Sequence, residues 1–399
     1  MTATPVSAAA SRFHALDALR AAMMFLGIYL HAAVAYSPEG GWPLRLGPLT
    51  KDLVWTLSVI HVFRMPIFYA MAGFFSALLV ARYGWRGAGL NRFTRIAVPF
   101  VVGWIIIWPI QVLVVGSTLY GIDRTLQALA SGLAFRYAGP MHLWFLEYLL
   151  LFYALAAIVA LPVAYLMSEK ARAAVVRVFT AVVRSPWAPL ALAVPSFAAQ
   201  LLMPDPWIKD PSGFMPEFAI VAVYAIPFAF GWLLYHSQGL LDVLSRRAWL
   251  YAPLAVIACV AYRWSYYLFP RHDWPGFYVI RAVHSLDMWL LILGVTGLFL
   301  RYLSGHSPLR RYLCDSSYFL YIAHFPMILV LQVLLVGVPA PPLVKVVLVL
   351  VGSIVLLLPL YRWGVRPTFI GAWLNGRRYP PTIGLAGFPT PEKVLATPH

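Results

Sequence analysis

The sequence predicts an all-α, polytopic integral membrane protein with about ten transmembrane helices. Its 399 residues are 62% hydrophobic and only 11% charged. A soluble domain needs a far more charged surface than this. The apolar residues also fall into runs of about 20, which is the length that a helix needs to cross a hydrocarbon core of about 30 Å.

The apolar runs define one membrane domain over residues 15–363. In chain order they are 15–37, 53–81, 96–119, 141–167, 187–203, 217–236, 248–269, 279–303, 315–338 and 343–363. A short polar lead, residues 1–14, precedes them. A tail rich in Pro, Gly and Arg, residues 364–399, follows them, and we expect it to be only partly ordered.

The net charge of +16 follows the positive-inside rule. With ten spans and both termini in the cytoplasm, most of the 30 lysines and arginines fall in inner segments and a minority in outer loops. The charge therefore predicts an N-in, C-in topology. A nucleic-acid partner is not needed to explain it.

The first apolar run contains a charged and a titratable side chain, Arg20 and His31. Eleven residues are about three helical turns, so both side chains lie on one face, about 16 Å apart along the axis. Ionisable residues in a spanning helix mainly face a bundle interior or a watery cavity and act there. Asp17 is placed to form an i, i+3 pair with Arg20 near the inner headgroups.

Several other spans carry ionisable groups at a similar depth. They are His61 and Arg64 in the second span, Glu147 in the fourth, Arg281, His284 and Asp287 in the eighth, and His324 in the ninth. Their common level indicates a shared polar chamber. Two structural alternatives stay open: His31 could be a satisfied core histidine, and Arg64 could form a buried ion pair with a carboxylate that only fixes helix packing.

The predicted cytoplasmic loop between the second and third spans carries Arg92 and Arg95, one turn apart. Two guanidinium groups on one face can address a single anion, and phosphate suits their geometry. Alternatively, the two arginines could serve only to set the membrane topology. That role would explain their presence in an inner loop but not why they lie on one helical face. We therefore expect a phosphate-binding pair.

As a set, these motifs resemble the acyltransferase family 3 membrane proteins, and within that family the branch that acts on glucans. The resemblance rests on Leu16-Asp17-Ala-Leu-Arg20 with His31 eleven residues later, Ile60-His61-Val-Phe-Arg64-Met-Pro66, Arg92-x-x-Arg95, His142-Leu-Trp144-Phe-Leu146, and Ser317-Tyr318-Phe-Leu-Tyr321-Ile-Ala-His324-Phe-Pro326. One departure is Ala72, where the family more often has Ser.

The resemblance implies a multi-pass O-acyltransferase of the bacterial inner membrane. It would take an acyl group from cytoplasmic acyl-CoA and place it on a glycan hydroxyl at the periplasmic side. In the glucan branch the acyl group is succinyl and the acceptor is an osmoregulated periplasmic glucan. Acyl-CoA, with succinyl-CoA favoured, would be a substrate and not a bound cofactor, and other proteins of glucan synthesis are possible partners.

The chemistry of acyl transfer assigns roles to the candidate residues. His31 would be the general base, with Glu147 or Asp287 to orient its ring, because a sugar hydroxyl needs a base near neutral pH. Arg64 would stabilise the oxyanion. The carboxylate of a succinyl group also needs a cation, for which Arg64, Arg263 and Arg281 are candidates.

The remaining candidate residues divide between the two ends of the site. By match of motif, Arg20 belongs with His31 to the active site, and Arg92 and Arg95 would hold the CoA phosphates. The supporting residues are Asp17, His61, His284, Asp287 and His324. No CxxC or HExxH spacing is present, so no metal site is expected.

Two alternative functions stay open. An O-acetyltransferase acting on lipopolysaccharide, peptidoglycan or another exported polysaccharide would carry the same motifs. A glycan or lipid transporter would also place polar residues on several helices, but it would usually show broken helices or a repeated half, and neither is evident in the sequence. The residues do not distinguish a covalent acyl-enzyme from direct transfer, and they do not define the oligomeric state.

Overall fold

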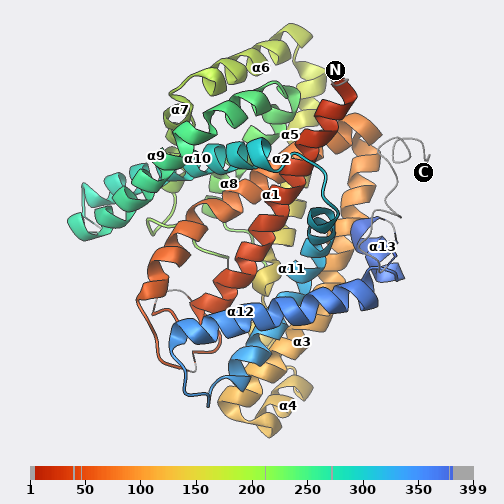
Figure 1. Ribbon diagram of the computed structural model, residues 1–399, viewed down its shortest axis with the longest axis vertical. Coiled ribbons are helices and arrows are strands. Elements are labelled where there is room, and N and C mark those ends of the chain that lie inside the picture. Colours follow the sequence, from red (N-terminus) through yellow and green to blue (C-terminus); the bar gives the residue numbers. More distant parts are fainter. Residues whose placement is uncertain are drawn as a thin grey trace.

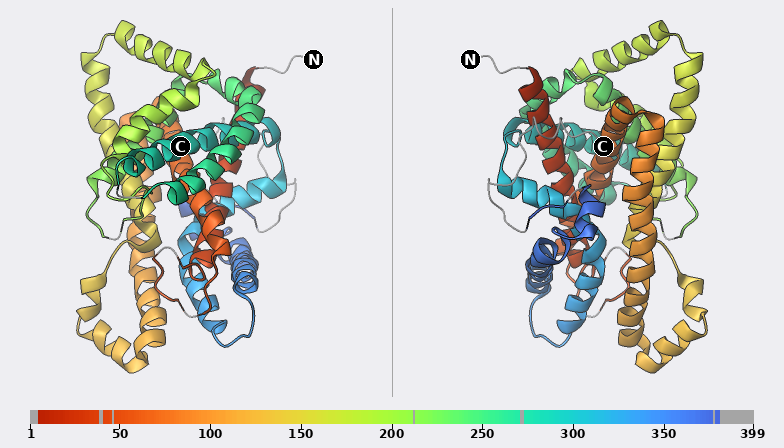
Figure 2. Two further views of the ribbon diagram at one scale, coloured as in Figure 1. Left: turned by 90° about the vertical axis from the view of Figure 1, so that its left-hand side faces the viewer. Right: turned by 90° about the vertical axis from the view of Figure 1, so that its right-hand side faces the viewer.

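The computed structural model describes residues 5–38, 41–45, 47–211, 213–270, 273–376 and 378–380 (Figures 1 and 2). This described part is helical and contains no strand, which confirms the predicted all-α class. Residues 1–4 of the predicted lead and residues 381–399 of the predicted tail lie outside it.

Thirteen α-helices follow one another along the described chain. They are α1 (Pro5–Val34), α2 (Asp52–Arg92), α3 (Val98–Tyr120), α4 (Ile122–Ala130), α5 (Trp144–Leu166), α6 (Glu169–Arg184), α7 (Ala188–Gln200), α8 (Phe218–His236), α9 (Leu240–Leu268), α10 (Gly276–Tyr302), α11 (Pro308–Leu334), α12 (Pro342–Pro359) and α13 (Phe369–Asn375). Four short elements complete the list: the π-helices η1 (Phe93–Ala97) and η4 (Leu360–Val365), and the 3₁₀ turns η2 (Leu133–Tyr137) and η3 (Met141–Leu143).

Among the described residues, eight helical segments are long and apolar enough to cross a bilayer, or nine if the bent pair α6 and α7 is one span. This is the pattern of a polytopic membrane protein. One segment, Asp52–Tyr120, has 69 residues and contains two predicted spans. A straight helix of that length would measure about 100 Å. Gly84, with φ 67° and ψ 175°, interrupts it, and the chain turns over there from α2 toward α3 (Figure 2).

The predicted span 187–203 is shorter in the structure. Helix α7 has 13 residues, which is about 20 Å and less than the hydrocarbon thickness. It follows α6 across a bend of 115°. The structure therefore does not confirm a count of ten, and the N-in, C-in orientation stays a prediction.

The two predicted sides of the membrane lie at opposite ends of the molecule. Figure 1 shows α6 and the start of α1 toward one end and α4 at the other. Helix α6 is amphipathic and carries Lys170, Arg172, Arg177 and Arg184, as a helix lying at a membrane surface does. This arrangement agrees with an inner segment at α6 and an outer segment at α4.

Close packing between α2 and α8 depends on glycine. A Cβ atom at Gly73 would overlap the carbonyl oxygen of Phe228, and one at Gly231 would overlap that of Ala70. Small residues let membrane helices approach at backbone distance, because lipid provides no hydrophobic force that would press them together. These two glycines thus determine how closely α2, which carries His61 and Arg64, packs against α8.

We predict that Gly231→Leu destabilises the protein by at least about 1–3 kcal/mol, because the new side chain has no room against α2. Thermal unfolding in detergent measures the loss. The same change at Gly239, which is exposed and has no atom within 4 Å of an added Cβ, is the control. Equal stability of the two variants would show that α2 and α8 are not in backbone contact.

Candidate active site

Three imidazoles from separate elements meet inside the helical domain. The ring centroid of His31 on α1 lies 5.2 Å from that of His324 on α11, and His324 lies 5.1 Å from His142 in the turn before α5. Phe325 stacks on His142 at 4.7 Å and meets His31 edge-on at 5.5 Å. Trp42, from the loop after α1, covers His31 at 5.4 Å. We call His31, His142 and His324 the histidine cluster.

Backbone carbonyls fix two of the three rings. His324 Nδ1 lies 2.7 Å from the carbonyl oxygen of Tyr321, and His142 Nε2 lies 3.1 Å from that of Ile322. A carbonyl only accepts, so these nitrogens carry the proton. His324 Nε2 and His142 Nδ1 are therefore acceptors, and both are buried without a hydrogen-bond partner, as is His31 Nδ1. The cluster has unused basic nitrogens where a proton could be received.

The turn that carries His142 is strained. Met141 has φ 54°, in the left-handed region that residues other than glycine rarely adopt. Two hydrogen bonds hold this turn: Tyr321 Oη donates to the carbonyl of His142 at 2.7 Å, and Trp104 Nε1 donates to that of Gly139 at 2.9 Å. Strained backbone persists where its surroundings impose it, and such positions cluster at functional sites.

A buried guanidinium lies beside the histidine cluster. Arg64 on α2 is 7% exposed, and an added Cβ at Gly27 would lie 2.5 Å from its NH1 atom. Gly27 precedes His31 by about one turn of α1, so the cation lies close to that imidazole, and its charge acts on it. Asp210, exposed in the loop after α7, is the carboxylate whose charge acts on both Arg64 and His61. The cluster and Arg64 thus form one polar site, and His61 lies one turn before Arg64 on α2.

The predicted row of polar groups on α10 lies apart from this site. Arg281 donates to the carbonyls of Gln200, Phe277, Met203 and Pro204. Asp287 accepts from Cys259 Sγ at 3.3 Å, and the ring of His284 packs 4.9 Å from that of Tyr262. Arg281 therefore holds the end of α7, and this group joins α7, α9 and α10.

The carboxylates expected to orient His31 do not contact it. Asp287 belongs to the α10 group. Glu147, in the first turn of α5, is partly buried, and its Oε2 atom has no hydrogen-bond partner. In the described part of the chain, the ring contacts of His31 are Trp42, Phe325 and His324 instead.

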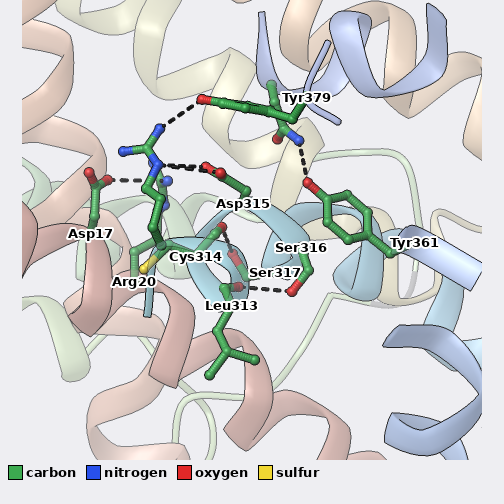
Figure 3. A network of polar contacts seen from close by, with 11 residues as sticks. Asp17, Arg20, Leu313, Cys314, Asp315, Ser316, Ser317, Tyr361 and Tyr379 are labelled. Atoms are coloured by element: carbon green, nitrogen blue, oxygen red, sulfur yellow. Dashed lines mark hydrogen bonds and ion pairs between the residues drawn. The ribbon is translucent and has the colours of Figure 1, made fainter. Parts of the chain in front are cut away.

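Arg20 is also separate from the histidine cluster. It pairs with Asp17 at 3.3 Å, and both side chains are partly exposed. Figure 3 shows this pair beside a second one on α11, where Arg311 binds Asp315 at 3.0 Å and donates to Tyr379 Oη at 3.2 Å. This network lies at the predicted cytoplasmic end, about three turns of α1 away from His31.

Arg92 and Arg95 lie close together around the π-helix η1, and their charges act on one another. The Arg92 guanidinium lies 4.7 Å from the ring centroid of Tyr153, and its Nε atom is buried without a partner. The Arg95 guanidinium lies against Gly376. The backbone carbonyl of Arg95 accepts a hydrogen bond from Tyr318 Oη at 2.8 Å. We call Arg92 and Arg95 the arginine pair.

Helix α11 connects the arginine pair to the histidine cluster. Tyr318, which binds Arg95, precedes His324 by six residues, or about 9 Å along the axis. Both ends of the candidate site therefore contact one rigid element.

Sequence reasoning missed several residues of the site. His142 appeared only as part of a motif, and Tyr321 and Phe325 fell within the same motif as His324 without an assigned role. Nothing in the sequence singled out Trp42 or Asp210. In the described residues, no group of three or more His, Cys, Asp or Glu side chains is arranged to hold a metal ion.

Histidines beside a guanidinium, inside a helical membrane domain and linked to an arginine pair, form a site suited to group transfer within a membrane. Comparison with known proteins identifies the class. Residues 13–362 match the acyltransferase 3 family, described as an acyltransferase domain, and the chain belongs to this family. It is therefore a multi-pass membrane acyltransferase, and the sequence-based assignment is confirmed.

Curated relatives are similar over a shorter stretch. Glucans biosynthesis protein C of Salmonella paratyphi B, Salmonella heidelberg and Salmonella enteritidis PT4 are each 33% identical to this chain over 95 residues. The match covers 24% of this chain and 24% of each relative, so the aligned segment spans about a quarter of their length. No solved structure matches this fold.

We predict that Met141→Gly is more stable than Met141→Ala by about 1 kcal/mol, because both variants lose the side chain but only glycine relieves the left-handed conformation. Thermal or denaturant unfolding of the two purified variants measures the difference. An alanine variant as stable as the glycine variant would show that position 141 is not left-handed in the folded protein.

Proposed function

We propose that this acyltransferase moves an acyl group, with succinyl favoured, from cytoplasmic acyl-CoA to a hydroxyl of a periplasmic glucan across the inner membrane. The observation that carries the proposal is the placement of His31 beside His324 and Arg64, with the arginine pair in contact with the same helix α11 through Tyr318. The name of the Salmonella relatives supports a glucan acceptor. Because the chain is an acyltransferase, a transporter function is not needed to explain its polar helices.

The arginine pair would bind the donor through its phosphates. Arg92 and Arg95 lie at the predicted cytoplasmic end, and guanidinium groups bind phosphate in a bidentate manner. The pantetheine arm would then extend along α11 toward His324. Donor and acceptor would meet inside the bundle, so neither substrate has to cross the membrane completely.

The histidine cluster would carry the chemistry. His31 would remove the proton from the acceptor hydroxyl as its oxygen attacks the thioester carbonyl. The new carbon–oxygen bond forms, the carbon–sulfur bond breaks, and the proton passes from His31 to the departing CoA sulfur. His324 Nε2, an acceptor 5.2 Å away by ring centroids, would orient the protonated His31 ring in place of the carboxylate expected from the sequence.

We predict that His31→Ala removes the acyl mass increment from periplasmic glucans, because the general base is lost, while the protein stays in the membrane. Mass spectrometry of glucans from cells carrying each variant measures it. His236→Ala, at an exposed histidine at the end of α8, is the control. Undiminished substitution in His31→Ala would remove this residue from the chemistry, and an acetyl increment on another exported glycan would favour the O-acetyltransferase alternative.

We compare two donors, acyl-CoA and the matching acyl-pantetheine, which lacks the nucleotide phosphates. We predict that Arg92→Ala lowers the ratio of kcat/KM for acyl-CoA to kcat/KM for acyl-pantetheine about tenfold or more, because a phosphate contact is lost. Transfer or hydrolysis assays with the two donors give this ratio. Arg86→Ala, at an exposed position of the same helix α2, should leave the ratio as it is in the wild type. A ratio unaffected by Arg92→Ala would assign the arginine pair to topology alone.

A further inference from the structure

Arg64 is a buried cation without an anionic partner. It is 7% exposed and its Nε atom is buried without a hydrogen-bond partner. Within the part of the chain that the structure describes, its guanidinium makes no ion pair and no hydrogen bond. Asp210 acts on it electrostatically from an exposed loop without pairing with it. An unpaired charge inside a membrane domain is costly, so its presence indicates that an anion is bound there during function.

A phenol lies within electrostatic reach of this cation. Arg64 interacts electrostatically with the phenols of Tyr224 and Tyr321, as it does with the imidazoles of His31, His61 and His324. Tyr321 Oη already donates to the His142 carbonyl. Tyr224 on α8 is 2% exposed and stacks on Tyr69 at 4.5 Å, and no hydrogen bond engages its hydroxyl among the described residues. Tyr69 follows Arg64 by five residues on α2, so the stack places Tyr224 against the same part of α2, with a hydroxyl that is free to donate to an anion beside Arg64.

The spacing fits an anion carried on the acyl group. Arg64 packs against Gly27, and His31 follows Gly27 by one turn, or about 6 Å along α1. In an extended succinyl thioester, two methylene carbons separate the carbonyl from the carboxylate, a reach of about 5 Å with bonds of about 1.5 Å. A carbonyl carbon at His31 would place the carboxylate near Arg64. An acetyl group has no atom that reaches this cation.

The other two arginines considered for the succinyl carboxylate are less suited. Arg281 is fully buried, and four backbone carbonyls occupy its donors. Arg263 on α9 donates to Tyr267 Oη at 3.1 Å in an exposed contact. Neither contacts the histidine cluster in the described part of the structure.

We infer that Arg64 and Tyr224 form a subsite for a terminal carboxylate of the acyl group, which makes the enzyme selective for dicarboxylic acyl donors over acetyl. The inference rests on the proposed function and assigns Arg64 to donor specificity in place of the oxyanion. A bidentate guanidinium and a phenol are a well-matched receptor for a carboxylate.

The test is the ratio of kcat/KM for succinyl-CoA to that for acetyl-CoA, measured with the full-length protein in detergent. The ratio does not depend on the fraction of active protein. Arg64→Gln should lower it about 30-fold or more, as expected for the loss of a buried charge contact. Tyr224→Phe should lower it about 2- to 10-fold, as expected for one hydrogen bond. Tyr235→Phe, the same change elsewhere on α8, should leave it as in the wild type.

Each other outcome has a defined meaning. If Arg64→Gln reduces both donors by the same factor, Arg64 acts on the oxyanion or on packing and the inference is overturned. If Arg64→Gln does not fold, an unchanged ratio in Tyr224→Phe overturns it. A wild-type enzyme that prefers acetyl-CoA overturns the inference and leaves acyl transfer intact, whereas a wild type inactive with both donors contradicts the proposed function itself.

Discussion

Polar side chains inside a membrane domain have to find their partners within the protein, because hydrocarbon offers none. Two buried arginines, Arg281 and Arg64, meet this constraint in opposite ways. Arg281 gives its donors to four carbonyls, three at the end of α7 or just after it and one in its own helix α10, and thereby joins these two helices. Arg64 has no such partners, although it is also buried. Arg281 thus belongs to the architecture, whereas Arg64 keeps donors that a bound anion can use.

The same distinction separates the histidines. Carbonyl contacts fix the rings of His142 and His324 and leave one acceptor nitrogen free on each. His31 packs between aromatic rings and a second imidazole. The rings of the cluster are therefore held in place, but each keeps a ring nitrogen without a hydrogen-bond partner. This suits a site that has to receive and release a proton.

Helix α11 organises both ends of the site. It contributes His324 to the histidine cluster and Tyr318 to the contact with Arg95. Near its start, Arg311 binds Asp315 and Tyr379, which ties the chain after α13 to this helix (Figure 3). A donor bound at the arginine pair and an acceptor near the histidine cluster would thus be positioned by one rigid element. Arg20 and Asp17, which face this start of α11, take part in the inner network and not in the histidine cluster.

The helical class and most of the spans could be predicted from the sequence, since they depend on composition and run length. The grouping of His31, Arg64 and His324 could also be anticipated, because ionisable residues at one depth tend to share an interior. Depth alone does not give the angle around the helix axis, and for that reason the sequence could not show that Asp287, a candidate to orient His31, contacts Cys259 on α9 instead. His142 lies in a strained turn, which no periodic pattern predicts. The close contact of Arg64 with α1 depends on Gly27, whose role appears only when the helices are packed.

The central claim is that imidazoles from α1 and α11 act as one catalytic unit. A double-mutant cycle of His31→Ala and His324→Ala on the acyl-transfer rate tests it directly, since residues that act together show strongly non-additive losses. If the two imidazoles act as one unit, the double variant will be about as slow as the slower single variant. Losses that multiply as independent factors would contradict it.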